Sequence, residues 1–208
     1  MIDIIPIDYA KSVLPESCIF ENGAENKLRP IIFRIYLLKT ENRLILVDAG
    51  CETMPGFEMQ DFIGPITALG NMGISPKQIT DVIITHAHHD HIECVKYFNN
   101  ATIYIQEDEY ADGKNYFTPE LNVCTFNAEL QICGGVKAVK IGGHSMGSSV
   151  VEITDENKQY VIAGDECYSM ECIQRQIPTG SSYNPEKSRD FIEKYGNGGY
   201  TVLLCHDQ

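Results

Sequence analysis

Four of the six histidines in this sequence fall within six residues of one another. They lie in one short segment with an aspartate among them: His86, His88, His89, Asp90 and His91. Neutral imidazole binds borderline metal ions such as Zn²⁺, and a carboxylate adds negative charge to such a site. The segment therefore has the residue types of a metal-binding site.

The spacing within this segment is suited to two ions rather than one. His86 and His88 are two residues apart, so on a locally extended loop both side chains can point the same way and hold one ion. Asp90 and His91 are adjacent, and a chain that turns into a helix at Ile92 can direct both toward a second ion.

Three further candidates lie far along the chain. His144 follows a glycine pair, Asp165 follows Ala163-Gly164, and His206 follows Cys205. Each comes directly after an expected strand or after a glycine turn that follows one, and such positions can converge on one sheet edge. His144 and His206 can complete one ion site each, and Asp165 can bridge the two ions. Metals about 3.5–4 Å apart hold a hydroxide that is nucleophilic at neutral pH.

The alternative is that these histidines are incidental. A lone histidine in a surface loop is usually just solvated, and a run of four can be a polar loop or an adventitious metal clip. Five of the six histidines nevertheless fall at strand ends in one consistent arrangement, which favours a two-metal site. His89 is the exception, because it would point away from the ions if its neighbours point toward them.

The elements that must position these residues read as strands interrupted by helices. Strands are expected over residues 31–38, 44–47, 82–85, 102–106, 136–141, 149–153, 160–163 and 201–205. Helices are expected over residues 62–72, 92–98 and 185–195. The strands come in hairpin-like groups, which favours two mixed sheets packed together with helices outside. No linker is evident, so one domain over residues 1–208 is expected.

The composition excludes several classes of partner. With 16 Lys and Arg against 29 Asp and Glu, the net charge is −13, which disfavours nucleic acid and anionic membrane surfaces. The apolar runs are too short to span a bilayer, and the N-terminus lacks the pattern of a secretory signal. The eight cysteines are scattered without a CxxC pair, so reduced, mostly buried thiols and a cytoplasmic location are expected.

The histidine and aspartate pattern resembles the metallo-β-lactamase superfamily. It has a His-x-His-x-Asp-His segment, a later Gly-His, an isolated Asp and a C-terminal His, and residues 46–50 resemble the family's first motif, a strand ending in Asp-x-Gly. The resemblance implies an α+β fold, a four-layer αββα sandwich with the site at the edge between its sheets. It also implies that His86, His88 and His144 hold one metal, that Asp90, His91 and His206 hold the other, and that Asp165 bridges them. Asp48 would either orient a ligand or cap the turn at Gly50.

A finer resemblance concerns Tyr168, which lies three residues after Asp165. The N-acyl-homoserine lactonases of this superfamily carry a tyrosine at that position, although a tyrosine after a strand can equally be a packing residue. Two departures from the lactonase pattern stand out. The polar Glu166 replaces a small residue beside the bridging Asp, and the chain is shorter than typical lactonases.

These features predict a metal-dependent hydrolase that opens a lactone or related ester of a small molecule. The metal-bridging hydroxide would attack the carbonyl, Tyr168 would donate to the developing oxyanion, and Asp90 or Asp165 would carry the proton to the leaving group. Two divalent ions are expected, zinc first, with iron or manganese as alternatives; a homodimer is left open. The alternatives are a thioesterase, a glyoxalase-II-like enzyme, a β-lactamase, or a non-catalytic metal-binding module.

Overall fold

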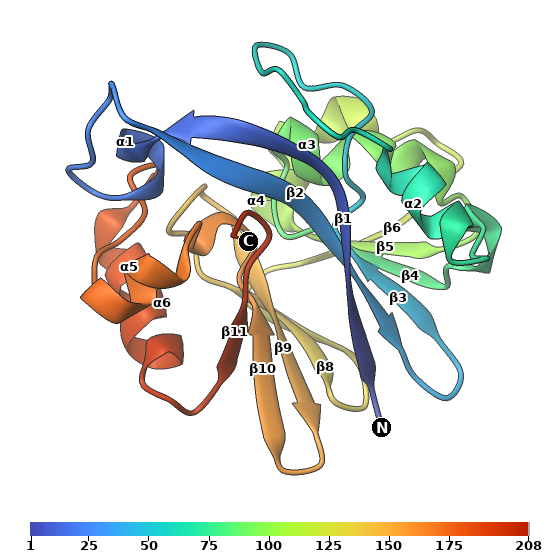
Figure 1. Cartoon of the computed structure of the whole chain (residues 1–208). Helices are drawn as coiled ribbons and strands as arrows, with labels where there is room; N and C mark the ends of the chain where they lie inside the picture. Colours follow the sequence, from blue (N-terminus) through green and yellow to red (C-terminus); the bar gives the residue numbers. More distant parts are fainter. Residues whose placement is uncertain (208) are drawn as a thin grey trace. The chain divides into compact units, whose positions relative to one another are not determined.

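The computed structural model describes residues 1–207 (Figure 1). These residues divide into two compact units. Unit 1 comprises Met1–Lys11 and Phe33–Asn127, and unit 2 comprises Ser12–Ile32 and the chain from Ala128 onward. The division falls within the two long strands β1 (Asp3–Pro15) and β2 (Leu28–Lys39). That the chain forms one domain stays a prediction.

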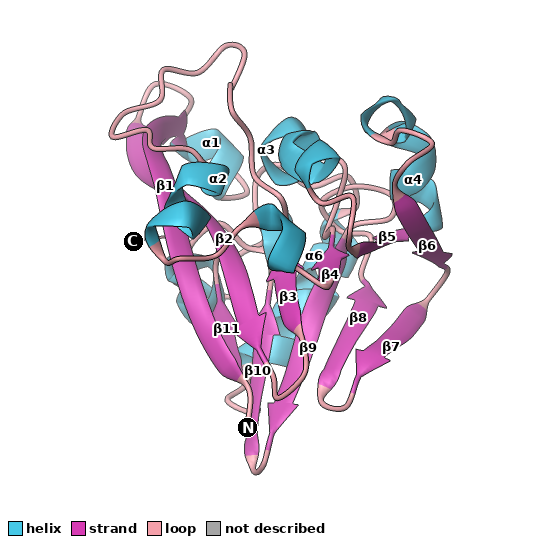
Figure 2. Cartoon of the chain, turned by 90° about the vertical axis from the view of Figure 1, so that its right-hand side faces the viewer, coloured by secondary structure: helices cyan, strands magenta, loops and turns pink. Residues whose placement is uncertain are grey.

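The first sheet has six strands in the order β1-β2-β3-β4-β5-β6, and the last four lie wholly in unit 1 (Figure 2). These four are β3 (Leu44–Val47), β4 (Asp81–Ile83), β5 (Thr102–Gln106) and β6 (Asn122–Phe126). Strands β2 and β3 form the expected antiparallel hairpin, and β3 to β6 run parallel. Because Val47 pairs with Ile83, the segments that follow β3 and β4 leave the sheet at the same edge. Asp48 and the histidine-rich segment therefore start side by side.

The helices of unit 1 are short, and two differ from expectation. The helix expected over residues 62–72 is α2 (Pro65–Asn71), which begins later because Gly64 lies at φ 75° and Pro65 occupies the first helical position. The helix expected from Ile92 is preceded by α3 (His89–Ile92) and continues as the 3₁₀ helix η2 (Glu93–Tyr97). The others are η1 (Pro76–Gln78), α4 (Glu107–Asp112) and η3 (Lys114–Tyr116). Asp90 and His91 are thus presented by a helical turn.

The second sheet has five strands in the order β11-β10-β9-β8-β7 and belongs to unit 2. Its strands are β7 (Glu129–Cys133), β8 (Val136–Lys140), β9 (Ser149–Asp155), β10 (Lys158–Ile162) and β11 (Thr201–Leu203). Only β10 and β11 are parallel; the other neighbours are antiparallel. Unit 2 also contains α1 (Glu16–Ile19), η4 (Gly164–Glu166), α5 (Met170–Arg175) and α6 (Pro185–Gly196), the last close to its predicted range.

Three strands were not predicted, and all three lie at sheet edges: β1 and β6 in the first sheet and β7 in the second. An edge strand has one unpaired side and tolerates proline and charge. Accordingly β1 contains Pro6, and β6 and β7 are half-exposed along most of their length. Their apolar pattern is weak for that reason, whereas the central strand β4 is buried throughout.

Two further expectations concern the whole chain. Five of the eight cysteines are buried, in agreement with the expectation of mostly buried thiols: Cys51, Cys94, Cys167, Cys172 and Cys205. Within residues 1–207, no helix combines the length and the apolar character needed to cross a bilayer.

Candidate metal centre

Asp48 orients His91 at the end of β3. It is fully buried and lies at φ 62°, a strained conformation for a non-glycine residue. Its Oδ1 accepts from the Thr85 N–H at 2.8 Å, and its Oδ2 lies 2.8 Å from His91 Nδ1. An ionised carboxylate only accepts, so Nδ1 of His91 carries the proton and Nε2 presents its lone pair. Of the two roles considered for Asp48, the structure shows the orienting one.

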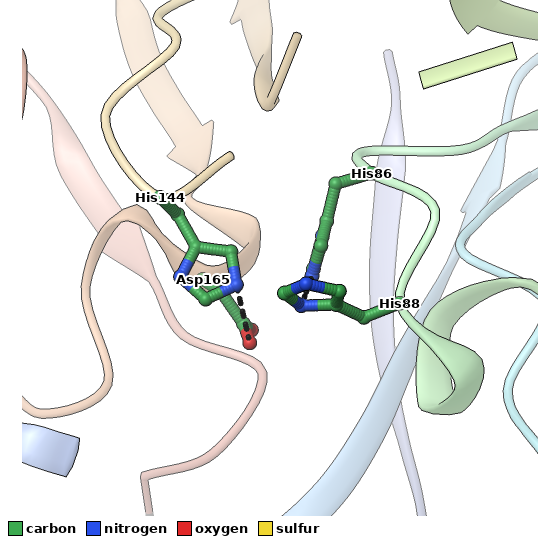
Figure 3. A group of neighbouring side chains, drawn as sticks. All are labelled: His86, His88, His144 and Asp165. Atoms are coloured by element: carbon green, nitrogen blue, oxygen red, sulfur yellow. Dashed lines mark hydrogen bonds and ion pairs between the residues drawn. The ribbon is translucent and has the colours of Figure 1, made fainter. Parts of the chain in front are cut away.

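His86 is oriented in the same way, through Thr85. The Thr85 hydroxyl donates to Asp48 Oδ1 at 2.9 Å, so its oxygen accepts from Nδ1 of His86 at 3.1 Å. This leaves Nε2 of His86 facing Nδ1 of His88 at 3.0 Å, with both rings on one loop (Figure 3). Two ring nitrogens turned toward each other are suited to ligating one ion together.

The backbone between these two histidines is held by Glu109, at the start of α4. Glu109 is 1% exposed, and its Oε2 accepts from the Ala87 N–H at 2.7 Å. A Cβ on Gly113 would lie 2.9 Å from the Ala87 Cβ, so only glycine allows α4 to end this close to the loop. Sequence reasoning missed Glu109, because nothing local to it signals a long-range contact to the histidine loop.

Asp90 and His91 lie together on α3. Oδ2 of Asp90 is 3.6 Å from Nε2 of His91, and the backbone carbonyl of Asp90 accepts from the Tyr9 hydroxyl at 3.1 Å. Burial, with the nearby Cys51 and Asp90, raises the pKa of Tyr9 well above its ordinary value, so Tyr9 remains a neutral donor. Burial also raises the pKa of the Cys51 thiol to about 12, so the thiol stays protonated at neutral pH.

His89 is directed toward other partners, as the sequence suggested. Its Nδ1 lies 2.9 Å from the Tyr116 hydroxyl, and its Nε2 lies 3.3 Å from Glu93 Oε2. Glu93 in turn accepts from the backbone N–H groups of Glu52 and Thr53. His89 therefore ties the histidine segment to the loop after β3.

In unit 2, His144 and His206 both present Nε2 to Asp165. Nδ1 of His144 lies 2.7 Å from the Ser181 carbonyl oxygen, and Nδ1 of His206 lies 2.8 Å from the Ile32 carbonyl oxygen. A carbonyl only accepts, so both rings carry the proton on Nδ1. Their Nε2 atoms lie 3.6 Å from Oδ2 and 3.1 Å from Oδ1 of Asp165, and Figure 3 shows the first of these contacts.

This donor set fits a divalent cation. Asp165 presents one oxygen to each imidazole, so its two oxygens face different nitrogen donors. An unprotonated Nε2 and a carboxylate oxygen both carry lone pairs, and a cation is the group that satisfies two such atoms at once. In unit 1 the nitrogens of His86, His88 and His91 offer the same chemistry.

Tyr168 lies against the same carboxylate. Its hydroxyl donates to Asp165 Oδ2 at 2.6 Å, and its ring stacks on His206 with centroids 5.1 Å apart and planes 15° apart. The tyrosine is 8% exposed. It therefore packs as a buried aromatic and also places a hydroxyl beside Asp165.

Glu166, the neighbour of Asp165, is completely buried. Burial raises its pKa to about 7, although hydrogen bonds from Ser148 and from the His144 and Gly143 N–H groups act in the opposite direction. The sequence marked this residue only as a departure from the lactonase pattern.

The predicted site residues thus gather in two clusters, one in each unit. The unit 1 cluster consists of His86, His88, Asp90 and His91, and the unit 2 cluster consists of His144, Asp165, Tyr168 and His206.

Comparison with known proteins adds a family and a fold. The family model described as the metallo-beta-lactamase superfamily matches residues 34–205. An N-acyl homoserine lactonase of Bacillus thuringiensis is 24% identical over 214 residues, covering 90% of this chain and 84% of that protein. The lactonase AiiB of Agrobacterium fabrum is 23% identical over 236 residues, covering 88% of this chain and 82% of that protein.

Solved structures agree over nearly the whole chain. An N-acyl homoserine lactone hydrolase with the product N-hexanoyl-L-homoserine at its catalytic metal centre has a TM-score of 0.85 and 22% identity, covering 98% of this chain and 92% of that one. AidC, a dizinc quorum-quenching lactonase, has a TM-score of 0.79 and 16% identity, covering 99% of this chain and 87% of that one.

Proposed function

Because the chain belongs to the metallo-beta-lactamase superfamily, we propose that it is a metal-dependent hydrolase that opens N-acyl homoserine lactones or closely related lactones. The predicted α+β fold and the predicted family are confirmed by the family model and by the structural neighbours. The lactone is inferred from the curated relatives that match most of the chain, which are lactonases.

The proposed metal centre combines the two clusters. One divalent ion would be held by His86, His88 and His144, and the other by Asp90, His91 and His206, with Asp165 bridging them. The observation that supports this assignment best is the protonation pattern of the rings. His86, His91, His144 and His206 each place Nδ1 against an oxygen that accepts its proton, which leaves Nε2 as the ligand atom in all four.

Zinc is the proposed metal. Imidazole and carboxylate donors suit zinc, iron and manganese, and occupancy depends on availability as well as on affinity. The similarity to a dizinc lactonase favours zinc. The homodimer stays a prediction.

The chain's own residues would contribute binding and proton transfer. Divalent ions in such a site polarise the substrate carbonyl and lower the pKa of a bound water. The Tyr168 hydroxyl, beside Asp165, would donate a hydrogen bond to the oxygen that becomes negative, and Asp90 or Asp165 would pass a proton to the leaving alkoxide. A neutral lactone also suits a chain with a net charge of −13 better than the anionic thioester of a glyoxalase-II-like enzyme.

The test is a substrate panel combined with metal analysis. The purified protein is expected to carry about two equivalents of metal and to hydrolyse N-acyl homoserine lactones faster than a thioester or a chromogenic β-lactam. A chelator should abolish turnover, and zinc should restore it. Preferred hydrolysis of the thioester would identify a thioesterase. Two bound metals without turnover of any substrate would identify a metal-binding module instead.

A further inference from the structure

The side chain of Glu166 makes its hydrogen bonds to the turn that carries His144. Its Oε1 accepts from the Gly143 N–H at 3.1 Å and from the His144 N–H at 3.2 Å. The same oxygen accepts from the Ser148 hydroxyl at 2.5 Å. One buried carboxylate oxygen therefore binds both ends of the turn from Gly143 to Ser148.

The turn is tied together around this contact. The Ser148 hydroxyl oxygen accepts from the Ser145 N–H at 3.1 Å, and the Ser148 carbonyl accepts from the Gly142 N–H at 2.9 Å. The hydrogen bonds to Glu166 add a fixed point outside the turn. Because Glu166 is the next residue after Asp165, this fixed point lies on the same backbone segment as the carboxylate that His144 faces.

Gly143 is shaped to this carboxylate. A Cβ at that position would lie 2.2 Å from Glu166 Oε2 and 2.6 Å from the Ser188 hydroxyl oxygen. Real Cβ atoms do not approach that closely, so the glycine, the glutamate and Ser188 fit one another only as they stand. The backbone of Gly143 therefore fits closely against the side chains of Glu166 and Ser188, which indicates a specific contact rather than incidental burial.

We propose that Glu166 is a positioning residue that fixes the backbone of His144, so that the imidazole Nε2 is held against Asp165. His144 is then held at two points. Glu166 binds its backbone N–H, and the Ser181 carbonyl binds its ring Nδ1. A ligand tethered twice loses less conformational freedom when it binds an ion, which strengthens metal binding. This inference rests on the proposed function, because it assigns His144 to a metal.

The test compares Glu166→Ala with Glu166→Gln. The alanine removes the acceptor, whereas the glutamine amide oxygen can still accept from Gly143, His144 and Ser148. Glu152→Ala is the matched control, since Glu152 is a partly buried carboxylate of unit 2 that lies on β9 and accepts from Lys194 and Tyr195 on α6, away from the His144 turn. If Glu166→Ala does not fold, Ser148→Ala is measured in its place, because it removes one of the donors to the same Glu166 oxygen.

The first readout is amide hydrogen exchange, which requires no metal. Glu166→Ala should accelerate exchange at Gly143 and His144 by about tenfold or more, because a hydrogen bond to a buried carboxylate is lost. Gly142, which donates to the Ser148 carbonyl, should change less, and Glu166→Gln should stay near wild type. Unchanged exchange at Gly143 and His144 in the alanine variant would overturn the proposal.

The second readout is zinc affinity, measured by competition with a chromogenic chelator. Glu166→Ala should weaken binding by about 10–100-fold, as loss of a residue that orients a ligand does, and Glu166→Gln should restore most of it. Equal weakening in Glu152→Ala, or faster exchange without weaker binding, would contradict a positioning role. If the wild-type protein binds no zinc, the proposed function fails, and the exchange measurement alone still decides whether Glu166 holds the turn.

Discussion

The two clusters of site residues are built in different ways. In unit 1, four donors come from one stretch of six residues and are oriented by side chains, mainly Asp48 and Thr85. In unit 2, three donors come from three distant segments, and the two histidines are oriented by backbone carbonyls of Ser181 and Ile32. A local motif can be oriented by one neighbouring carboxylate, whereas dispersed ligands depend on the tertiary fold around them.

The difference predicts where substitutions act. The orientation of the unit 1 ligands can be removed by changing a side chain, since the accepting oxygens belong to Asp48 and Thr85. The contacts that the Ser181 and Ile32 carbonyls make to the unit 2 histidine rings cannot be removed by substituting Ser181 or Ile32, since a substitution leaves the backbone carbonyl in place.

Asp165→Ala should have the largest effect, because Asp165 is the residue that both unit 2 histidines face. Turnover of a lactone should fall by more than the roughly 10–100-fold that loss of an orienting partner costs, and metal content should fall below two equivalents. Steady-state kinetics and elemental analysis measure the two effects. Full activity in this variant would mean that another group bridges the ions.

Asp48→Asn and Ser181→Ala form a matched pair across the two clusters. The asparagine keeps the shape of Asp48 but loses one acceptor oxygen, so it cannot hold both Thr85 and His91 as the carboxylate does. Metal affinity should fall by about 10–100-fold. Ser181→Ala should leave affinity within about twofold, because the Ser181 backbone carbonyl is the acceptor. The reverse ranking in a chelator competition would contradict the comparison.

Tyr168→Phe separates catalysis from metal binding. The phenyl ring can still stack on His206, so metal content should be retained. The loss of a donor to the developing oxyanion should lower kcat by well over tenfold, since one such donor is typically worth about 3 kcal/mol. An unchanged kcat for lactones would reduce Tyr168 to a packing residue.

Glu152 lies outside both clusters, and Glu152→Gln should have the smallest effect, a modest loss of folding stability. Burial alone would raise the pKa of Glu152, but hydrogen bonds from Lys194, Tyr195 and Lys137 outweigh it and hold the pKa below the ordinary 4.5. A lowered pKa stabilises the fold above the unfolded-state value, and this stability is lost as the pH falls through the folded-state value. The variant should therefore be less stable than wild type at pH 7, by about 0.5–1 kcal/mol.

The difference between the two proteins should shrink as the pH drops below about 4.5. Urea unfolding of both proteins in chelator at several pH values measures it. A difference that grows toward acid pH would contradict the assigned sign. Lactone turnover by Glu152→Gln at neutral pH should match wild type.

How much of the site the sequence could predict follows from the same comparison. The unit 1 motif could be recognised from the sequence because its four donors lie close together in the chain. His144, Asp165 and His206 could be recognised only as isolated residues after strands and through their place in the family pattern. Glu109 and Glu166 were missed as supports, because each acts on a loop more than 20 residues away and no local pattern shows such a pairing.

For the fold, predictability followed burial. Central strands such as β4 and β5 have continuous apolar or alternating patterns and were located to within about two residues. The edge strands β1, β6 and β7 were missed because half of their surface is exposed and their sequence is mixed. The start of α3 at His89 was misplaced, because a run of histidines and an aspartate gives no helical periodicity.

Imidazole nitrogen NMR during a zinc titration tests most directly whether both clusters bind metal together. We predict that Nε2 of His86, His91, His144 and His206, and Nδ1 of His88, shift in the same titration, which saturates near two equivalents. The His89 ring should change least. Shifts confined to the segment from His86 to His91, with His144 and His206 unaffected, would show that the unit 2 histidines bind no metal and would contradict the joint centre.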